Sequence, residues 1–364
     1  MSGSSLDGLD IAYATMEWAD AAQTDIKWSL HAAETLPFSE LWQTRLRDLP
    51  KADALAFART HTYFGYYMAE LVQAFLQKNG LKNSDIDLVS SHGQTIFQQP
   101  DRRFTTQIGC GAALAAVLQC DVACDFRTHD IALNGEGTPL APIADKHLFG
   151  GYDFYVNLGG IANISCNLGE QFVAFDTGAA NQILNRLANQ IGLEYDKNGE
   201  NARNGNLQQP LLDALAALPY HAQPFPKSLS NQWVQQVVGT LVDAYDAPIN
   251  DKLHTVCVHI AAEIARAAAA CQADKRYIQR STKEKTPQLF LTGGGALNTF
   301  LVAQIRAALA PDIALVLPEK QIIDFKEALL MCVLGFLRIE KRTNTMASVT
   351  GAKRDTIGGA LYCR

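Results

Sequence analysis

Long apolar runs are missing from this sequence, and so is an excess of basic residues. No stretch of about 18 or more residues is apolar, so a membrane-spanning helix is not predicted. The formal net charge of −6 at pH 7 argues against a surface that binds nucleic acid or an anionic membrane. Asp7, Asp10 and Glu17 stand where a signal peptide would have a basic start and an apolar core. We therefore expect a cytoplasmic protein with no nucleic-acid and no membrane partner.

Closely paired cysteines are missing as well. The eight cysteines include no CxxC pair, and only Cys120 and Cys124 lie near each other. Zinc sites and disulfide frameworks are usually recognised by close cysteine spacings. We expect all eight cysteines to be reduced and mostly buried, and the sequence leaves any metal ligands unknown.

Strand-like and helix-like segments alternate along the chain, which is typical of an α/β fold. A length of 364 residues exceeds that of one ordinary domain and favours two. We expect 125–145 to cross between the domains and 210–226 to be an insertion over a site. The expected strands are 86–92, 153–160, 171–178, 287–295 and 313–318, and the expected helices are 61–80, 106–120, 179–192 and 257–273.

The segment LTGGGALNTFLVAQI places Gly293, Gly294 and Gly295 between an apolar strand and a helix. Glycine lets a ligand approach the backbone closely, and the start of a helix supplies free N–H groups. The pattern is neither a Walker A loop nor a GxGxxG fingerprint. It favours a nucleotide site, with a tight turn that binds nothing as the alternative.

Two other glycine-rich loops resemble each other. The opening SGSSLDG contains Gly3, Ser4, Ser5, Asp7 and Gly8 and leads into a strand-like segment at 9–18. In VNLGGIANIS, the pair Gly159-Gly160 separates two strands and is compatible either with a plain type I′ turn or with a phosphate contact. One such hairpin in each domain would hold a polyphosphate between them.

The segment FDTGAANQILN carries the sharpest candidate for catalysis. An apolar strand is expected to end at Asp176, with a turn at Thr177-Gly178 and a helix from Ala179. A carboxylate at the end of a strand, near phosphate-binding turns, is suited to act as a general base in phosphoryl transfer. The alternative is an aspartate that caps the helix.

Three further polar residues have both a functional and a structural interpretation. In SHGQTIF, His92 and Gln94 follow a strand and are placed to hydrogen-bond a sugar or to order a loop. In DFKEALLMCVLGFL, Glu327 is expected near a helix N-terminus, where an acid commonly complements the helix dipole. A functional role for Glu327 therefore needs independent support.

Taken together and in this order, the motifs resemble those of the 1,6-anhydro-N-acetylmuramic acid kinases, which belong to the sugar kinase, heat-shock cognate and actin superfamily. The motifs are MSGSSLDGLD, SHGQTIF, QIGCGAALA, DFRTHD, GEGTPLAP, NLGGIANIS, FDTGAAN, KSLSNQWV, LTGGGALN, KEAL and SVTGAKRD. The resemblance covers essentially the whole chain. It implies a two-domain, actin-like α/β fold with a deep cleft, formed by 1–124 with 327–364 and by 125–326.

The resemblance also implies a reaction and a site. ATP with Mg²⁺ would place its phosphates against Gly3, Ser4, Ser5, Asp7 and Gly8, with Gly159 and Gly160 opposite and the adenosine on Gly293 to Gly295. Asp176 would draw a proton from the water that opens the 1,6-anhydro bridge, and the freed O6 would take the γ-phosphoryl group. Glu327 would hydrogen-bond the sugar. The product would be N-acetylmuramic acid 6-phosphate, a step in peptidoglycan recycling, and a homodimer is expected.

Three features depart from the usual family pattern. The opening loop usually reads GTS, where this chain keeps a hydroxyl in Gly3-Ser4-Ser5. Pro-Gly commonly follows the DTG turn, where this chain has Ala179-Ala180, so we expect a different setting of the loop around the base. An apolar strand usually precedes MSG, so either the coding sequence begins upstream of Met1, which we expect, or the protein works without that strand. In a chain that begins at Met1 we expect weaker ATP binding.

Two other functions fit the same residues. One is a non-catalytic relative that binds a sugar or a nucleotide, and the other is a kinase for an amino sugar with an open ring. ADP release with anhydro and open-ring sugars would distinguish the two enzymes. Ligand-stabilised melting without turnover would indicate a binding protein.

Overall fold

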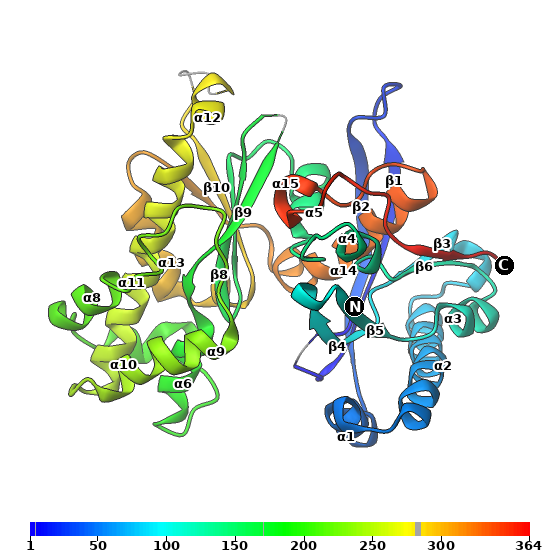
Figure 1. The fold of residues 1–364 in the computed structure, drawn as a ribbon, viewed down its shortest axis with the longest axis horizontal. Helices are drawn as coiled ribbons and strands as arrows, with labels where there is room; N and C mark the ends of the chain where they lie inside the picture. The colour runs from blue at the N-terminus through cyan, green and yellow to red at the C-terminus, as the bar shows by residue number, and fades with distance from the viewer. Residues whose placement is uncertain (4, 170, 281–284) are drawn as a thin grey trace. The chain divides into compact units, whose positions relative to one another are not determined.

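The computed structural model describes residues 1–3, 5–169, 171–280 and 285–364, and the chain divides into two compact units (Figure 1). Unit 1 comprises Met1–Gly150 and Phe325–Arg364, and unit 2 comprises Gly151–Asp324. Both units combine sheets with helices, so the expected α/β class is confirmed. The expected cleft between the domains stays a prediction.

Unit 1 is built around groups of paired strands and the long helices beside them. β1 and β2 form an antiparallel hairpin, β12, β6 and β3 form a second sheet, and β4 pairs with β5. Its elements are β1 (Gly8–Trp18), β2 (Ile26–Pro37), α1 (Glu40–Asp48), α2 (Ala54–Lys78), β3 (Leu88–Ser91), β4 (Gln94–Gln99), β5 (Phe104–Ile108), α3 (Gly111–Leu118), β6 (Asp121–Cys124), α4 (Thr128–Ala132), α5 (Ala141–His147), α15 (Ala347–Thr350) and β12 (Ala360–Tyr362), together with α14 (Lys320–Ile339) from Phe325 on.

The helix expected at 106–120 begins later than predicted. Residues Phe104–Ile108 form β5 instead, because they pair in antiparallel register with β4, and α3 starts only after Cys110. Long-range strand pairing has here overridden the local apolar pattern. α2, by contrast, starts earlier than the expected 61–80, with the Asp53 carboxylate accepting a hydrogen bond from the N–H of Ala56 at 2.8 Å.

An apolar gap separates the β1–β2 hairpin from the β12-β6-β3 sheet in unit 1. Among the described residues β1 pairs with β2 and, through one bridge between Leu9 and Ser2, with the start of the chain, while β3 pairs with β6. A cavity of about 440 Å³ lies between β1 and β3, lined by Leu9 to Met16, Leu88 to Ser91 and apolar side chains of α2 and α14. The Met1 ammonium donates to the carbonyl oxygen of Asp10 at 2.7 Å, so Met1 lies at this cavity.

Unit 2 is organised by a single five-stranded sheet in the order β11-β10-β7-β8-β9. β10 runs parallel to β7 and β11, and the β7–β8 and β8–β9 pairs are antiparallel. α11 packs on β8 and β9, and on α13, so that the core fills the space between helices and sheet (Figure 1). The strands are β7 (Phe154–Leu158), β8 (Ile161–Asn167), β9 (Phe172–Ala179), β10 (Gln288–Thr292) and β11 (Ala314–Val316), and the helices are α6 (Asn181–Asn189), α7 (Glu200–Arg203), α8 (Gln209–Ala216), α9 (Asn231–Trp233), α10 (Thr240–Ala244), α11 (Ile249–Gln272), α12 (Lys275–Arg280) and α13 (Thr299–Leu309).

The first boundary between the units lies further along the chain than the predicted 124/125. Residues 125–150 pack within unit 1 rather than crossing to unit 2. The buried carboxylate of Asp130 accepts a hydrogen bond from Oγ1 of Thr350 at 2.7 Å, and Nε1 of Trp28 donates to the carbonyl oxygen of Leu148 at 3.0 Å. Because these partners are distant in sequence, the local glycine- and proline-rich pattern did not reveal them. The second boundary, at 324/325, lies close to the predicted 326/327.

Candidate functional site

Asp176 lies inside β9 rather than at its end. The strand continues to Ala179, and α6 starts at Asn181 with Ala180 at its N-cap. The alternative that Asp176 caps a helix is therefore wrong. Its neighbours Phe175 and Thr177 line a cavity of unit 2, and the register of β9 against β8 shifts at this point, between the Asn163–Asp176 and Ala162–Gly178 pairs.

The Asp176 carboxylate is held by the loop between α8 and α9, which we call the 217–230 loop. The N–H of Leu229 donates to Oδ2 of Asp176 at 2.7 Å, and the N–H of Asp176 donates to the carbonyl oxygen of Lys227 at 3.1 Å. The hydroxyl of Tyr220 donates to the carbonyl oxygen of Asp176 at 2.8 Å. Three contacts from one loop thus fix the position of this carboxylate and its backbone.

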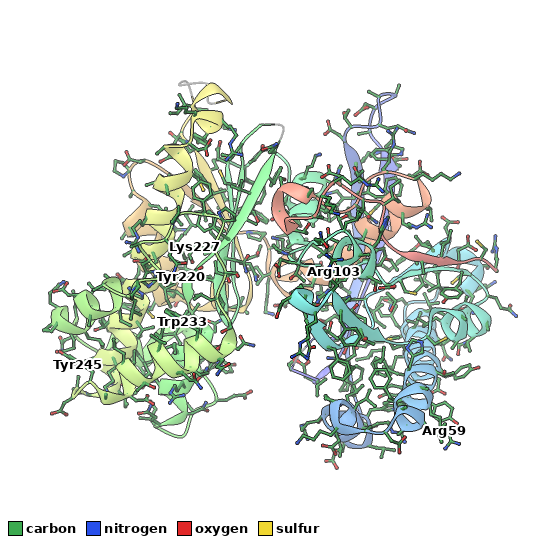
Figure 2. All side chains as sticks on the ribbon, in the orientation of Figure 1. Arg59, Arg103, Tyr220, Lys227, Trp233 and Tyr245 are labelled. Atoms are coloured by element: carbon green, nitrogen blue, oxygen red, sulfur yellow. The ribbon has the colours of Figure 1, made fainter. Side chains whose placement is uncertain are left out.

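Tyr220 and Lys227 also stabilise the loop itself. Nζ of Lys227 lies 4.6 Å from the centre of the Tyr220 ring and donates to the carbonyl oxygen of Tyr220 at 3.1 Å (Figure 2). Trp233 at the end of α9 packs beside the same ring, with centroids 5.6 Å apart. Of the stretch 210–226, predicted to be an insertion over a site, the first part belongs to α8 and Tyr220 contacts Asp176. Whether the stretch is an insertion stays a prediction.

Burial raises the pKa of Asp176 to about 6, and the hydrogen bond from Leu229 opposes this rise. The carboxylate is consequently ionised at neutral pH, with a proton affinity well above that of an ordinary aspartate. A general base works best when its pKa lies near the working pH. Asp176 therefore has the electrostatics of a general base.

The two glycine turns predicted in unit 2 lie next to each other. A Cβ added to Gly293 would stand 2.7 Å from the backbone nitrogen of Leu158. A Cβ added to Gly295 would stand 2.7 Å from the Cβ of Leu158. Gly159 follows Leu158 directly. Asn181 joins the turns, because its Nδ2 donates to the carbonyl oxygen of Leu158 at 2.9 Å and its N–H to that of Gly159 at 3.2 Å.

The glycines of these turns differ in their surroundings. Gly293 has φ of +85°, a backbone conformation that favours glycine, and is packed against β7. Gly294 is exposed, and a Cβ there would have only Nδ2 of Asn181 within 4 Å, at 4.0 Å. An incoming ligand therefore meets open backbone at Gly294. Neither Gly159 nor Gly160 has a positive φ, so their turn is not of type I′.

The helix behind the GGG turn does not follow it directly. Gly294–Leu297 form a short 3-10 turn, and α13 begins at Thr299 with Oδ1 of Asn298 accepting the N–H of Leu301 at 3.0 Å. The expected free N–H groups at a helix start are thus partly used within the chain. The glycine backbone, rather than the helix end, is the surface available to a nucleotide.

The opening loop of unit 1 is ordered by its own polar groups. Oδ1 of Asp7 accepts hydrogen bonds from Oγ of Ser5 at 2.5 Å and from the N–H of Gly8 at 3.0 Å, while Ser5 and Asp7 stay exposed. A Cβ on Gly8 would lie 2.5 Å from the carbonyl oxygen of Leu36, so Gly8 is required for packing on β2, whereas Gly3 has more room. Ser4 lies outside the described residues.

His92 and Gln94 belong to a buried polar cluster in unit 1. Oγ of Ser2 donates to Oε1 of Gln94, and a terminal nitrogen of Arg127 donates to Nε2 of His92 at 2.9 Å. Burial, and next the Arg127 charge, lower the pKa of His92 well below its ordinary value, so the imidazole is neutral. Arg127 donates to Nε2, which assigns the ring proton to Nδ1.

Glu327 lies about two turns inside α14, which begins at Lys320, so its interpretation as a helix-dipole partner is wrong. Desolvation by its surroundings, followed by the charge of Asp10, raises the pKa of Glu327, and Arg127 opposes this rise. Glu327 therefore shares its surroundings with Arg127, which also contacts His92. Arg127 and Asp10 were not predicted as site residues, although the motifs DFRTHD and SLDGLD contain them.

None of the described helices has the length and the apolar character needed to cross a membrane. Unit 2 combines a positioned carboxylate base with paired glycine turns, and unit 1 combines an acidic, hydroxyl-bearing loop with an arginine–histidine–glutamate cluster. These features define the class of the protein, an α/β phosphotransferase.

Comparison with known proteins identifies the family. The model of the anhydro-N-acetylmuramic acid kinase family matches residues 1–364. The chain is 30% identical over 378 residues to the anhydro-N-acetylmuramic acid kinase of a Sulfurovum species and 31% identical over 378 residues to that of Photobacterium profundum, in each case over 100% of this chain and 97% of the relative. The chain belongs to the anhydro-N-acetylmuramic acid kinase family, as the sequence motifs indicated, and it is a kinase.

Among solved structures, component A of the Acidaminococcus fermentans (R)-2-hydroxyglutaryl-CoA dehydratase is similar to this chain. The match covers 91% of this chain and 99% of the other, with 12% sequence identity and a TM-score of 0.41. No conclusion about function follows from a likeness of this size.

Proposed function

We propose that this protein opens the 1,6-anhydro bridge of 1,6-anhydro-N-acetylmuramic acid by hydrolysis and phosphorylates O6 with ATP. A water proton passes to the Asp176 carboxylate while the water oxygen bonds to the anomeric carbon and the C1–O6 bond breaks. O6 then bonds to the γ-phosphorus as the bond to ADP breaks. The products are ADP and N-acetylmuramic acid 6-phosphate.

The observation that carries this proposal is the setting of Asp176. Its carboxylate is oriented by the N–H of Leu229 and has a pKa of about 6, so it is ionised yet basic at neutral pH. Proton transfer to a positioned base typically contributes roughly 10²–10⁴ in rate. An anhydro bridge masks the hydroxyl to be phosphorylated, so hydrolysis needs such a base before transfer can occur.

The glycine turns and the opening loop are proposed to bind ATP. Gly159, Gly160 and Gly293 to Gly295 are the proposed ATP contacts in unit 2, and Gly3, Ser4, Ser5, Asp7 and Gly8 are those in unit 1. The exposed carboxylate of Asp7 and hydroxyl of Ser5 are oxygen donors of the kind that Mg²⁺ prefers. Mg²⁺ would neutralise the charge on the phosphates.

The buried cluster of unit 1 is proposed to bind the sugar. Arg127 is a largely desolvated cation whose pKa burial lowers to about 10, so it keeps its charge at neutral pH. It would recognise the lactyl carboxylate, while Glu327 and Gln94 would hydrogen-bond hydroxyl or amide groups. His92, which accepts from Arg127, would orient the guanidinium.

Measuring ADP release with Mg-ATP and either the anhydro sugar or open-ring N-acetylmuramic acid tests this proposal. We expect turnover with the anhydro sugar and little with the open-ring sugar. Turnover with the open-ring sugar alone would indicate an ordinary amino-sugar kinase. Stabilisation by ligands without any ADP release would indicate a binding protein.

The pH dependence of catalysis follows from the pKa of Asp176. The base acts in its carboxylate form, so kcat/KM for the sugar should be constant above about pH 6 and fall as pH decreases through this value. Below it the decrease should approach about tenfold per pH unit. Steady-state kinetics between about pH 4.5 and 8 in a mixed buffer would check this, at roughly constant ionic strength. A profile that breaks near the ordinary aspartate pKa would contradict it.

We also propose that the protein is a homodimer, as the family resemblance implies, and that it acts in the cytoplasm, as we expect from its composition. Light scattering after size-exclusion chromatography would measure the mass of the particle. A mass equal to that of one chain would contradict the dimer.

A further inference from the structure

Unit 2 contains a buried cluster of two imidazoles and one carboxylate that the proposed reaction does not use. His259 and Glu263 lie one turn apart on α11, and His221 comes from the 217–230 loop. His259, Glu263 and His221 are 4%, 6% and 7% exposed, respectively. One possible ligand atom of each lies within 4.8 Å of the others, and in the part of the chain that the structure describes this is the only group of its kind.

One nitrogen atom in this cluster lacks a hydrogen-bond partner among the described residues. Nδ1 of His259 has none, whereas Nδ1 of His221 lies 2.9 Å from Oε2 of Glu263. Such an unpaired buried atom is rare in folded proteins and calls for an explanation. The two rings meet edge to face, with centroids 5.0 Å apart and an interplanar angle of 77°, so they do not stack.

The cluster also has an access route, and one carboxylate oxygen of Glu263 has room for a further partner. A cavity of about 540 Å³ reaches His221 and Glu263 and leaves room for a water as a further ligand. Arg266 contacts the same Oε2 of Glu263 that lies near His221, which leaves Oε1 for another partner.

We propose that His221, His259 and Glu263 bind one transition-metal ion, with Zn²⁺ as the expected occupant. Two imidazoles and a carboxylate with an open position are a known ligand set for zinc. Imidazole nitrogen suits Zn²⁺, Co²⁺ and Ni²⁺, whereas Mg²⁺ prefers oxygen, so this site is separate from the Mg²⁺ of ATP. The proposal does not depend on the proposed reaction.

The position of the site suggests its role. His221 is the neighbour in sequence of Tyr220, which donates to Asp176, and Leu229 of the same loop donates to the Asp176 carboxylate. An ion bound to His221 and to α11 would fasten the 217–230 loop to the core of unit 2. The three side chains are thus ligands, and through the loop they position the base.

Titration of the full chain with Co²⁺, after purification without a metal-affinity tag, tests the site. We expect one Co²⁺ per chain with visible absorption typical of tetrahedral coordination, displaced by Zn²⁺ and not by excess Mg²⁺. Zn²⁺ should also raise the melting temperature. A folded chain that gives no such absorption would overturn the proposal.

Variants locate the ion. His259→Gln and Glu263→Gln each remove one ligand and should weaken Co²⁺ binding by more than about 100-fold, beyond the effect typical of groups around the ligands. His254→Gln changes a histidine on the same helix whose Nδ1 instead lies 3.0 Å from the carbonyl oxygen of Ala202, and it should bind Co²⁺ normally. Circular dichroism checks that the variants fold. Unchanged binding in both ligand variants, or loss of binding in His254→Gln alone, would overturn the assignment.

Discussion

Asp176→Asn is expected to reduce sugar-dependent ADP release by roughly 10²–10⁴, because the variant cannot accept a proton from the attacking water. Asparagine has the same shape, and its side-chain oxygen can still accept the hydrogen bond from the N–H of Leu229. The loss should therefore appear in kcat, with KM for ATP nearly unchanged. Initial rates at saturating ATP and sugar measure it.

The stability of the same variant provides an independent check. Burial raises the pKa of Asp176, so the ionised carboxylate lowers the free energy of unfolding as pH rises from the unfolded pKa through about 6. Asparagine carries no charge, so the variant should melt at or above the wild-type temperature at neutral pH. Asp213→Asn, which changes an exposed acid of the same unit, should leave both rate and melting unchanged. A variant that is inactive because it is unfolded, or one that keeps more than about a tenth of the activity, would contradict the assignment.

The sequence predicts Asp176 as a candidate base, but it does not predict which residues surround its carboxylate, and the reason is physical. The apolar run before it and the turn-forming Thr-Gly after it are local signals, and they predicted a strand and a helix on either side. That the strand continues to Ala179 depends on pairing with β8, which includes a register shift near Asn163. The contacts from Tyr220 and Leu229 come from residues more than forty positions away in the chain. No local pattern contains that information.

The buried polar cluster of unit 1 can likewise be predicted from the sequence only in part. His92, Gln94 and Glu327 were found as polar residues within recognisable motifs, and Arg127 was missed although it contacts His92 directly. An arginine in an irregular stretch most often lies on a solvated surface, and the pattern of 125–145 predicts a crossing between domains. Arg127 becomes informative only once this stretch is seen to pack on unit 1, where it is placed beside the histidine and near Glu327.

The GGG turn allows a matched pair of variants that separates folding from nucleotide binding. Gly293 has φ of +85° and ψ of 164°, a conformation close to exclusive to glycine, and an added Cβ would lie 2.7 Å from the Leu158 nitrogen. We expect Gly293→Ala to lower the free energy of unfolding by about 2–5 kcal/mol, from backbone strain and overpacking together. Denaturant titration measures this, and ATP-dependent turnover should fall with the folded fraction.

The variant Gly294→Ala tests nucleotide binding without disturbing the fold. The added methyl group would enter open space, since the nearest atom, Nδ2 of Asn181, is 4.0 Å away, so the unfolding free energy should stay within about 0.5 kcal/mol of wild type. If a nucleotide lies on this turn, the methyl group keeps it from the backbone, and KM for ATP should rise at least about tenfold, or about 1.4 kcal/mol. An unchanged KM in a fully folded Gly294→Ala variant would remove the GGG turn from the ATP site. A raised KM with unchanged stability would place the nucleotide there, because the methyl group has nothing else to disturb.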